Sequence, residues 1–304
     1  MTTSIIQPFG IDLHHETNPV TTIRRHLKGV TVDEIQERVD AFLGRSTASM
    51  TDTEIRAAYD LIVHPGTSQS MSFTKSRVTV REGTNFYRGR KLLNPTDELK
   101  TTADVWAPRP EWVRNPGRLN SAGEPILYTS SEDPTTVIHE CRIRVEDTFA
   151  ISRFEAKNTF DSTLVGEDAL PPGLTADEIS KMEIIQRFLS QAFSANVKDT
   201  DPDPYRTSRL IALDYFDLPP QLFKGWAFRS VVDPGGIGWN FSFRPEVGRK
   251  SLRYKETHVY RLLGFDSDGR RPLTEFLAAI KPAKGEQLSW QSPEKFKSID
   301  PFWP

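Results

Sequence analysis

The spacing of apolar residues predicts two helices near the start of the chain. After the capping-box pattern Thr31–Glu34, apolar side chains recur at helical intervals over residues 32–44. The same capping pattern at Thr51–Glu54 opens a second apolar stripe, which Pro65 ends. A pair of amphipathic helices is more often a packing element than a partner-binding one. We therefore predict an N-terminal helical extension.

From Arg77 onward, polar and apolar residues alternate in short runs, as is typical of half-buried β-strands. Strands are predicted over residues 77–81, 85–88, 125–130, 148–155, 226–232, 239–243 and 259–263. Helical spacing and capping residues predict helices over 134–144, 175–193, 203–217 and 276–280. Because strands and helices mix without a regular β–α–β order, the predicted fold class is α+β.

The pattern divides the chain into three regions. Residues 1–72 are expected to form the helical extension, residues 73–250 a catalytic domain, and residues 251–304 a C-terminal extension packed on that domain. The segment up to Asn18 is expected to be irregular, and the C-terminal end to be an extended tail. His14-His15-Glu16 is interpreted as part of an exposed polar tail, not as a metal site, since no further ligand has a useful spacing.

Composition and charge argue against several classes of protein, including those that bind nucleic acid or span a membrane. The 304 residues include 39 Lys and Arg against 41 Asp and Glu, so no global field favours nucleic acid or an anionic membrane as a partner. Cys141 is the one cysteine, which excludes an internal disulfide and fits a reducing compartment. No apolar stretch reaches the roughly 18–20 residues of a membrane span, and the N-terminus lacks a signal-peptide pattern. We expect a soluble cytoplasmic protein.

The first candidate binding residues lie on a predicted strand and in a predicted turn. Arg88 follows Phe86 and Tyr87 on the strand, where a guanidinium can hold a pyrophosphate or form a structural salt bridge. Arg118 and Asn120 belong to a Gly-Arg-x-Asn turn, where they can fix a ribose or a loop carbonyl.

Two further candidates follow on the next strand and helix. Tyr128 lies near the end of the predicted strand, where it either fills the core or covers a flat ring. Glu140 lies on the predicted helix shortly after two apolar residues, where a carboxylate on the packed face is costly, although helical geometry can also turn it outward. His139 points away from Glu140 by ~100° and is interpreted as a surface or supporting residue.

Ser230 and Asn240 lie on two predicted strands that a glycine-rich hairpin loop joins, so both are expected near one end of the sheet. The loop segment Gly235–Gly238 superficially resembles a phosphate-binding loop. No helix and no Gly-Lys-Ser/Thr follows it, so a hairpin turn is the better interpretation.

The order of Arg88, Glu140 and Ser230, with the Gly-Arg-x-Asn turn and the Leu-Tyr-x-Ser segment at Leu127–Ser130, resembles the RES domain family, named for those three residue types. The similarity covers residues 86–245. The resemblance implies an ADP-ribosyltransferase-like split mixed sheet with surrounding helices, and an activity that consumes NAD. Relatives are bacterial toxins, so it also implies growth arrest and a helix-turn-helix antitoxin that blocks the cleft.

In NAD the ribose is attached to a cationic pyridinium, so nicotinamide leaves as a neutral molecule without a general acid. One carboxylate is therefore enough, unlike the carboxylate pair of ordinary glycosidases. The resemblance implies that Glu140 stabilises the ribosyl cation, Arg88 holds the phosphates, Tyr128 holds the nicotinamide end, and Ser230 and Asn240 orient the ribose. Arg118 and Asn120 would add substrate contacts.

Several alternatives remain open. Water as acceptor gives a NAD glycohydrolase, inorganic phosphate gives a NAD phosphorylase, and a protein side chain gives an ADP-ribosyltransferase. No metal or bound cofactor is implied, because NAD is the substrate. A catalytically silent binding module of the same fold would instead use the helical extension to hold a partner. That extension is expected to support the fold, to cover the site, or to build a homodimer.

Overall fold

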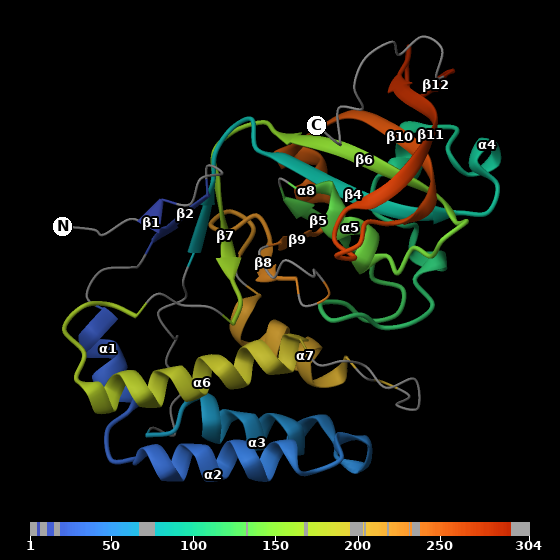
Figure 1. Cartoon of the computed structure of the whole chain (residues 1–304). Helices are drawn as coiled ribbons and strands as arrows, with labels where there is room; N and C mark the ends of the chain where they lie inside the picture. Colours follow the sequence, from blue (N-terminus) through green and yellow to red (C-terminus); the bar gives the residue numbers. More distant parts are fainter. Residues whose placement is uncertain are drawn as a thin grey trace.

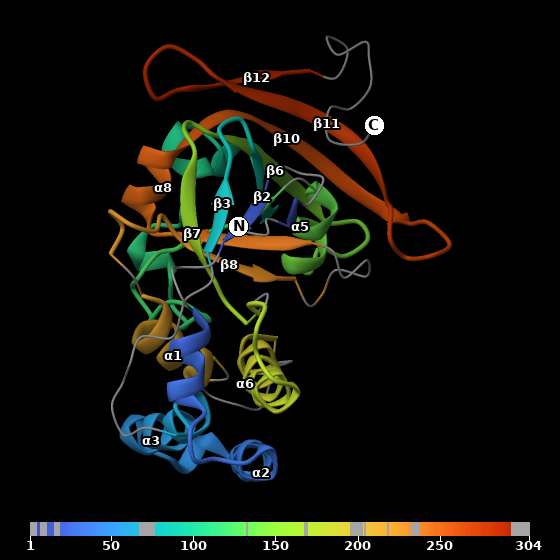
Figure 2. The same cartoon turned by 90° about the vertical axis from the view of Figure 1, so that its left-hand side faces the viewer.

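The computed structural model describes residues 5–6, 11–14, 19–66, 77–131, 133–166, 170–194, 203, 205–217, 219–230, 232 and 238–292. In these residues one large mixed sheet lies above a layer of helices (Figure 1, Figure 2). Its strand order is β1-β2-β3-β7-β8-β9-β5-β4-β6-β10-β11-β12. The α+β class is confirmed at this level.

The strands are β1 (Ile5–Ile6), β2 (Ile11–His14), β3 (Arg77–Val80), β4 (Asn85–Leu92), β5 (Leu127–Ser131), β6 (Thr148–Ala156), β7 (Phe160–Leu164), β8 (Trp226–Arg229), β9 (Trp239–Phe243), β10 (Leu252–Phe265), β11 (Pro272–Pro282) and β12 (Leu288–Gln291). The α-helices are α1 (Pro19–His26), α2 (Val32–Leu43), α3 (Asp52–Val63), α4 (Pro95–Glu98), α5 (Pro134–Glu140), α6 (Ala176–Ser194), α7 (Arg206–Ile211) and α8 (Pro245–Ser251). Short turns of other helix types are η1 (Thr47–Ser49), η2 (Thr102–Val105), η3 (Pro110–Trp112) and η4 (Ala212–Phe216).

Helices α2 and α3 begin where the capping boxes predict. The Thr31 hydroxyl accepts a hydrogen bond from the Glu34 N–H at 3.2 Å, and the Glu34 carboxylate accepts one from the Thr31 N–H at 2.7 Å. Thr51 and Glu54 make the same two bonds at the start of α3. Each box pairs donors that the first helical turn cannot pair by itself.

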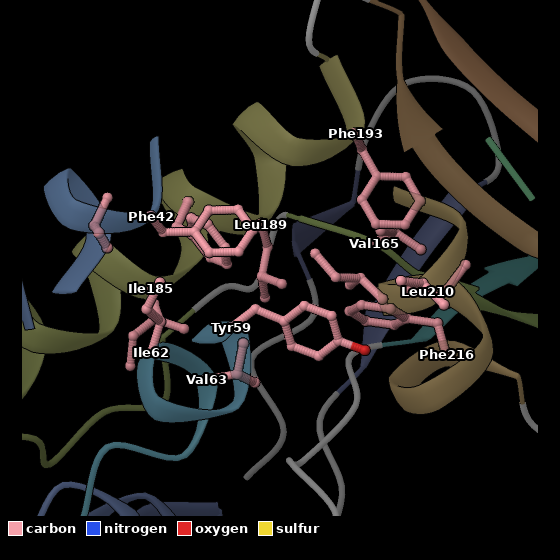
Figure 3. Close-up of a cluster of buried hydrophobic side chains, with 14 of the residues drawn as sticks. Phe42, Tyr59, Ile62, Val63, Val165, Ile185, Leu189, Phe193, Leu210 and Phe216 are labelled. Atoms are coloured by element: carbon pink, nitrogen blue, oxygen red, sulfur yellow. The ribbon is translucent and has the colours of Figure 1, made fainter. Parts of the chain in front are cut away.

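The helical layer has one hydrophobic core, shared by α2, α3, α6 and α7 and closed from above by β8 (Figure 3). Phe42 on α2 meets Phe188 on α6 edge to face, with ring centroids 5.3 Å apart. Other buried members of this core are Ile35, Val39, Ile55, Tyr59, Ile62, Ile185, Leu189, Leu210, Trp226 and Phe228. The predicted N-terminal helices therefore have their packing partner in the long helix α6.

The sheet opens between β4 and β5. In the described part of the chain, these strands pair only where Phe86 and Tyr87 face Ser131 and Ser130. Strand β5 nevertheless pairs with β9, and β4 with β6, along their whole lengths. The two halves of the sheet therefore separate just beyond Tyr87.

Two sequence predictions differ from the structure. Residues 276–280, predicted to be helical, belong to β11 and pair with β10 and partly with β12. The apolar run there contains good helix formers, but strand pairing on both sides overrides that weak preference. The segment before Asn18, predicted to be irregular, contains β1 and β2, which extend the sheet from β3. The predicted loop residues 233–237, like His15 and Glu16, lie outside the described residues.

The C-terminal region contributes to the interior of the sheet. Strand β10 lies between β6 and β11, so it is a central strand. Arg153 Nε on β6 donates to Glu256 Oε1 on β10 at 3.1 Å. The neighbouring His258 side chain and the Arg153 guanidinium outweigh the effect of burial and hold the pKa of Glu256 at about 2. None of the described helices is long and apolar enough to cross a membrane.

Candidate functional site

The close approach of α5 to β4 places the site's carboxylate. A Cβ atom added to Gly89 would lie 2.1 Å from Val137 Cγ1 and 2.8 Å from Cys141 Sγ, so only glycine permits this approach. Asp133 caps the helix by accepting from the Thr135 N–H at 2.7 Å. Strand β4 and helix α5 together bring Arg88 and Glu140 to one cavity.

That cavity, of about 320 Å³, lies where β4 and β5 separate. It is lined by residues of β4, β5, β8, β9 and α5, by the Gly117–Arg118 turn, and by Tyr205 at the start of α7. Its volume falls in the range of small-molecule sites. The helical layer thus supplies one wall of the cavity, and the opened sheet, α5 and the Gly117–Arg118 turn supply the others.

Glu140 is held through one of its two oxygens. Its Oε1 accepts a hydrogen bond from Ser230 Oγ at 2.7 Å and another from Asn240 Nδ2. The other oxygen, Oε2, makes no hydrogen bond with a described residue, and the side chain as a whole is exposed. Two neutral donors therefore fix the carboxylate without cancelling its charge.

Arg88 is a cation without a bound counter-charge in the described residues, since its guanidinium makes no ion pair or side-chain hydrogen bond with any of them. Burial lowers its pKa, which the nearby Cys141 opposes and the like charge of Arg90 reinforces. A guanidinium in this setting is well suited to an anion, because a carboxylate or phosphate would satisfy both its charge and its donors.

Arg118 is positioned from the helical layer. It donates to the backbone carbonyl of Phe193 near the end of α6, and its guanidinium lies over the Tyr205 ring, 4.8 Å from the centroid. Burial lowers its pKa, while attraction to Tyr205, Glu140 and Tyr128 opposes that effect. Arg118 therefore places a second positive charge within electrostatic reach of Glu140.

Tyr128 lines the cavity, and Asn120 holds it in place. The Tyr128 hydroxyl donates to Asn120 Oδ1 at 3.0 Å, while Asn120 Nδ2 donates to the Glu124 carbonyl at 2.8 Å. Burial raises the pKa of Tyr128. A Cβ atom on Gly117 would lie 2.5 Å from Asn120 Oδ1, which explains the glycine in this turn.

The predicted site residues fall into two groups. Those that line the cavity are Arg88, Arg118, Tyr128, Glu140 and Asn240. Ser230 and Asn120 do not line it: buried Ser230 supports Glu140, and Asn120 binds a loop carbonyl, the second of its two predicted alternatives. His139 stacks on Phe265, with ring centroids 5.3 Å apart, in a supporting position.

Among the cavity residues that sequence reasoning did not predict are two aromatic ones, Tyr205 and Phe228. Phe228 follows the strand alternation that places Trp226 and Ser230 on the same face, so that pattern could have found it. Tyr205 precedes a helix far along the chain, and no local signal places it near Arg118.

A comparison of the chain with protein-family models, curated proteins and solved structures finds no match. The described residues also contain no group of three or more His, Cys, Asp or Glu side chains that could hold a metal ion.

Proposed function

We propose that this protein cleaves the nicotinamide–ribose bond of NAD. The observation that carries the proposal is Glu140, which two donors hold at a cavity that also contains Arg88 and Arg118. The resemblance to the RES domain family suggests NAD as the ligand. The cavity supplies the charges and aromatic surfaces that such a ligand needs.

Glu140 would stabilise the positive charge that develops on the ribose as nicotinamide departs. Its Oε1 is held by Ser230 and Asn240, so Oε2 is left for the ribose hydroxyls. Fixed charges in a partly enclosed site stabilise a transition state strongly, because they need no reorganisation during the reaction. Glu140 is the one carboxylate among the described lining residues, and a neutral leaving group requires no second one.

Arg88 would bind the pyrophosphate. Arg88 is half-buried, and a guanidinium withdrawn from solvent is costly unless an anion pairs with it. A phosphate oxygen pair matches its planar donor fork. Arg118 would add a second contact, with Tyr128 along the flat nicotinamide ring.

The acceptor separates the members of this reaction class. Purified protein would be incubated with NAD in phosphate-free buffer and in buffer with added inorganic phosphate, and the products would be separated by chromatography. Nicotinamide and ADP-ribose in both buffers indicate water as acceptor, whereas phosphorylated ADP-ribose indicates phosphate. Absence of nicotinamide release in either buffer, and with cell extract as a source of protein acceptors, would contradict the proposal.

The resemblance extends the proposal to the cell. Loss of NAD would arrest growth, and a small helix-turn-helix partner would relieve the arrest by blocking the cavity. Expression should lower the cellular NAD content, and expression of Glu140→Gln should leave it unchanged.

A further inference from the structure

We propose that Tyr205 contacts the substrate in the cavity, and that Arg206, clamped by the N-terminal helices, positions it there. The substrate contact rests on the proposed function for its ligand. The positioning of Tyr205 is a separate claim, which is tested without any ligand.

Tyr205 has ring surface and a hydroxyl available to a ligand. The half-buried ring covers the Arg118 guanidinium and also lines the cavity, near Tyr128 and Phe228. Its hydroxyl makes no hydrogen bond with a described residue. Such a side chain suits a ligand part that is flat and also carries polar groups, as a nucleoside does.

Arg206 binds the start of α7 to the N-terminal helices. Its Nε donates to Asp52 Oδ1 at 2.6 Å, and its Nη1 donates to the carbonyl of Met50 at 2.6 Å and to that of Thr47 at 3.3 Å. Thr47 belongs to η1, Met50 directly follows η1, and Asp52 is the first residue of α3. One guanidinium thus fixes the residue next to Tyr205 against a segment 154 to 159 positions away in sequence.

A second set of bonds holds the far end of the same segment. Tyr59 and Arg56 on α3 donate to Asp214 in η4, the latter at 2.8 Å. Tyr215 donates to Asp60 at 2.6 Å. Burial would raise the pKa of Asp60, but hydrogen bonds from Tyr215 and His64 outweigh it and lower that pKa.

Helix α3 therefore holds residues 205–216 at both ends, and α7 lies beside α3 and α6 (Figure 1). Because Tyr205 covers Arg118, a shift of this segment would move both the aromatic wall and a cation of the cavity. The N-terminal helices thereby take part in building the site, although none of their side chains lines it.

The positioning claim is tested through Cys141, the chain's one cysteine, which lies in the cavity wall. Burial raises the pKa of its thiol to about 11, so N-ethylmaleimide should label the native protein slowly. Tyr205→Ala removes the contact between the ring and Arg118, and Arg206→Gln and Asp52→Asn release the segment that carries the ring. We expect Cys141 to be labelled at least about fivefold faster in all three variants, because each loosens the cavity wall. Tyr205→Phe, which keeps the ring, should label like the wild type.

Arg24→Gln is the matched control. Arg24 binds Glu178 at 2.9 Å and so also links an N-terminal helix to α6, but neither residue lines the cavity. Its labelling rate should equal that of the wild type. Equal rates for all variants would overturn the positioning claim, and so would equal acceleration in Arg24→Gln. Unfolding midpoints measured in parallel show whether faster labelling reflects global unfolding, in which case the claim also fails.

The substrate contact is tested by titration calorimetry with ADP-ribose. Tyr205→Ala should weaken binding at least about fivefold. Arg206→Gln should weaken it as well, and the double variant should be no weaker than Tyr205→Ala alone, because Arg206 acts through Tyr205. Unchanged affinity of Tyr205→Ala, or additive effects, would overturn the inference. A wild-type protein that binds neither ADP-ribose nor NAD would overturn the proposed function, while the labelling result would still decide the positioning claim.

Discussion

At the scale of single residues, the site depends on how Glu140 is held. Ser230 and Asn240 both donate to the same oxygen of its carboxylate. Neutral donors orient a carboxylate while leaving its charge available, which an arginine partner would not do. Because both donors bind Oε1, Ser230 is a positioning residue and Oε2 of Glu140 is left for the substrate.

Removal of the Ser230 hydroxyl should therefore slow the reaction without much effect on binding. We expect Ser230→Ala to lower kcat on the order of tenfold, as one hydrogen bond to a charged group is lost, with KM nearly unchanged. Steady-state kinetics of nicotinamide release measure both constants. A variant with normal kcat would show that Asn240 alone suffices to hold Glu140.

Glu256 provides a pH-dependent test away from the site. Its folded-state pKa of about 2 lies below the ordinary 4.5, so its charge stabilises the protein above pH 4.5, and this contribution is lost as the pH falls toward 2. Glu256→Gln should lower the free energy of unfolding by about 2–3 kcal/mol at pH 7 and by much less near pH 3. Urea denaturation at both pH values measures this difference.

Glu275 supplies the matched control for that experiment. It pairs with Arg261 across the neighbouring strands, but both side chains are more than 40% exposed. Glu275→Gln should change the unfolding free energy by less than about 1 kcal/mol at either pH. Equal effects of the two substitutions would show that burial of the Glu256 pair contributes nothing.

At the scale of elements, the distance between α5 and β4 sets the relation of Glu140 to Arg88. Gly89→Ala would place a methyl group against Val137 and Cys141, and the helix would have to move. We expect a loss of about 1–3 kcal/mol in stability and a lower kcat from the displaced carboxylate. Gly264→Ala is the control, because a Cβ atom there meets nothing within 4 Å. If Gly89→Ala is as active and stable as Gly264→Ala, the close approach is not required.

The elements also show where sequence reasoning succeeds and where it stops. The capping boxes at Thr31 and Thr51 are local, so the starts of α2 and α3 were predictable. The run at 276–280 has a composition compatible with helix or strand. It is a strand because it pairs with β10, and this pairing leaves no signal in the local sequence. Arg88 and Glu140 were predicted from their order along the chain and Asn240 from the hairpin pattern, and all three line the cavity. Tyr205 was not predicted, because only the folding of α3 against α7 brings it to Arg118.

At the scale of the whole molecule, the N-terminal helices complete the core under the sheet. Ile62 on α3 is fully buried in that core, whereas its neighbour Leu61 is 57% exposed. Ile62→Ala should therefore cost about 2–5 kcal/mol of unfolding free energy, and Leu61→Ala should cost less than about 0.5 kcal/mol. Chemical denaturation of the two variants tests whether this layer is part of the cooperative fold.

Deletion of residues 1–70 should destabilise the protein more than Ile62→Ala does. It would expose the apolar faces of α6 and α7, including Ile185, Phe188 and Leu210, so the truncated protein is expected to aggregate or to lose cooperative unfolding. Soluble expression and thermal unfolding provide the measurement. A soluble truncated protein that turns over NAD faster than the full chain would instead identify the helices as an inhibitory cover.

The central claim is that Glu140 is the carboxylate that drives NAD cleavage. The most direct measurement compares nicotinamide release by the wild type and by Glu140→Gln, with circular dichroism and unfolding midpoints to verify the fold. The amide keeps the shape and a hydrogen-bonding oxygen but removes the charge, so the rate should fall by about 10²–10³ in a folded protein. Near-normal nicotinamide release by folded Glu140→Gln would contradict the account.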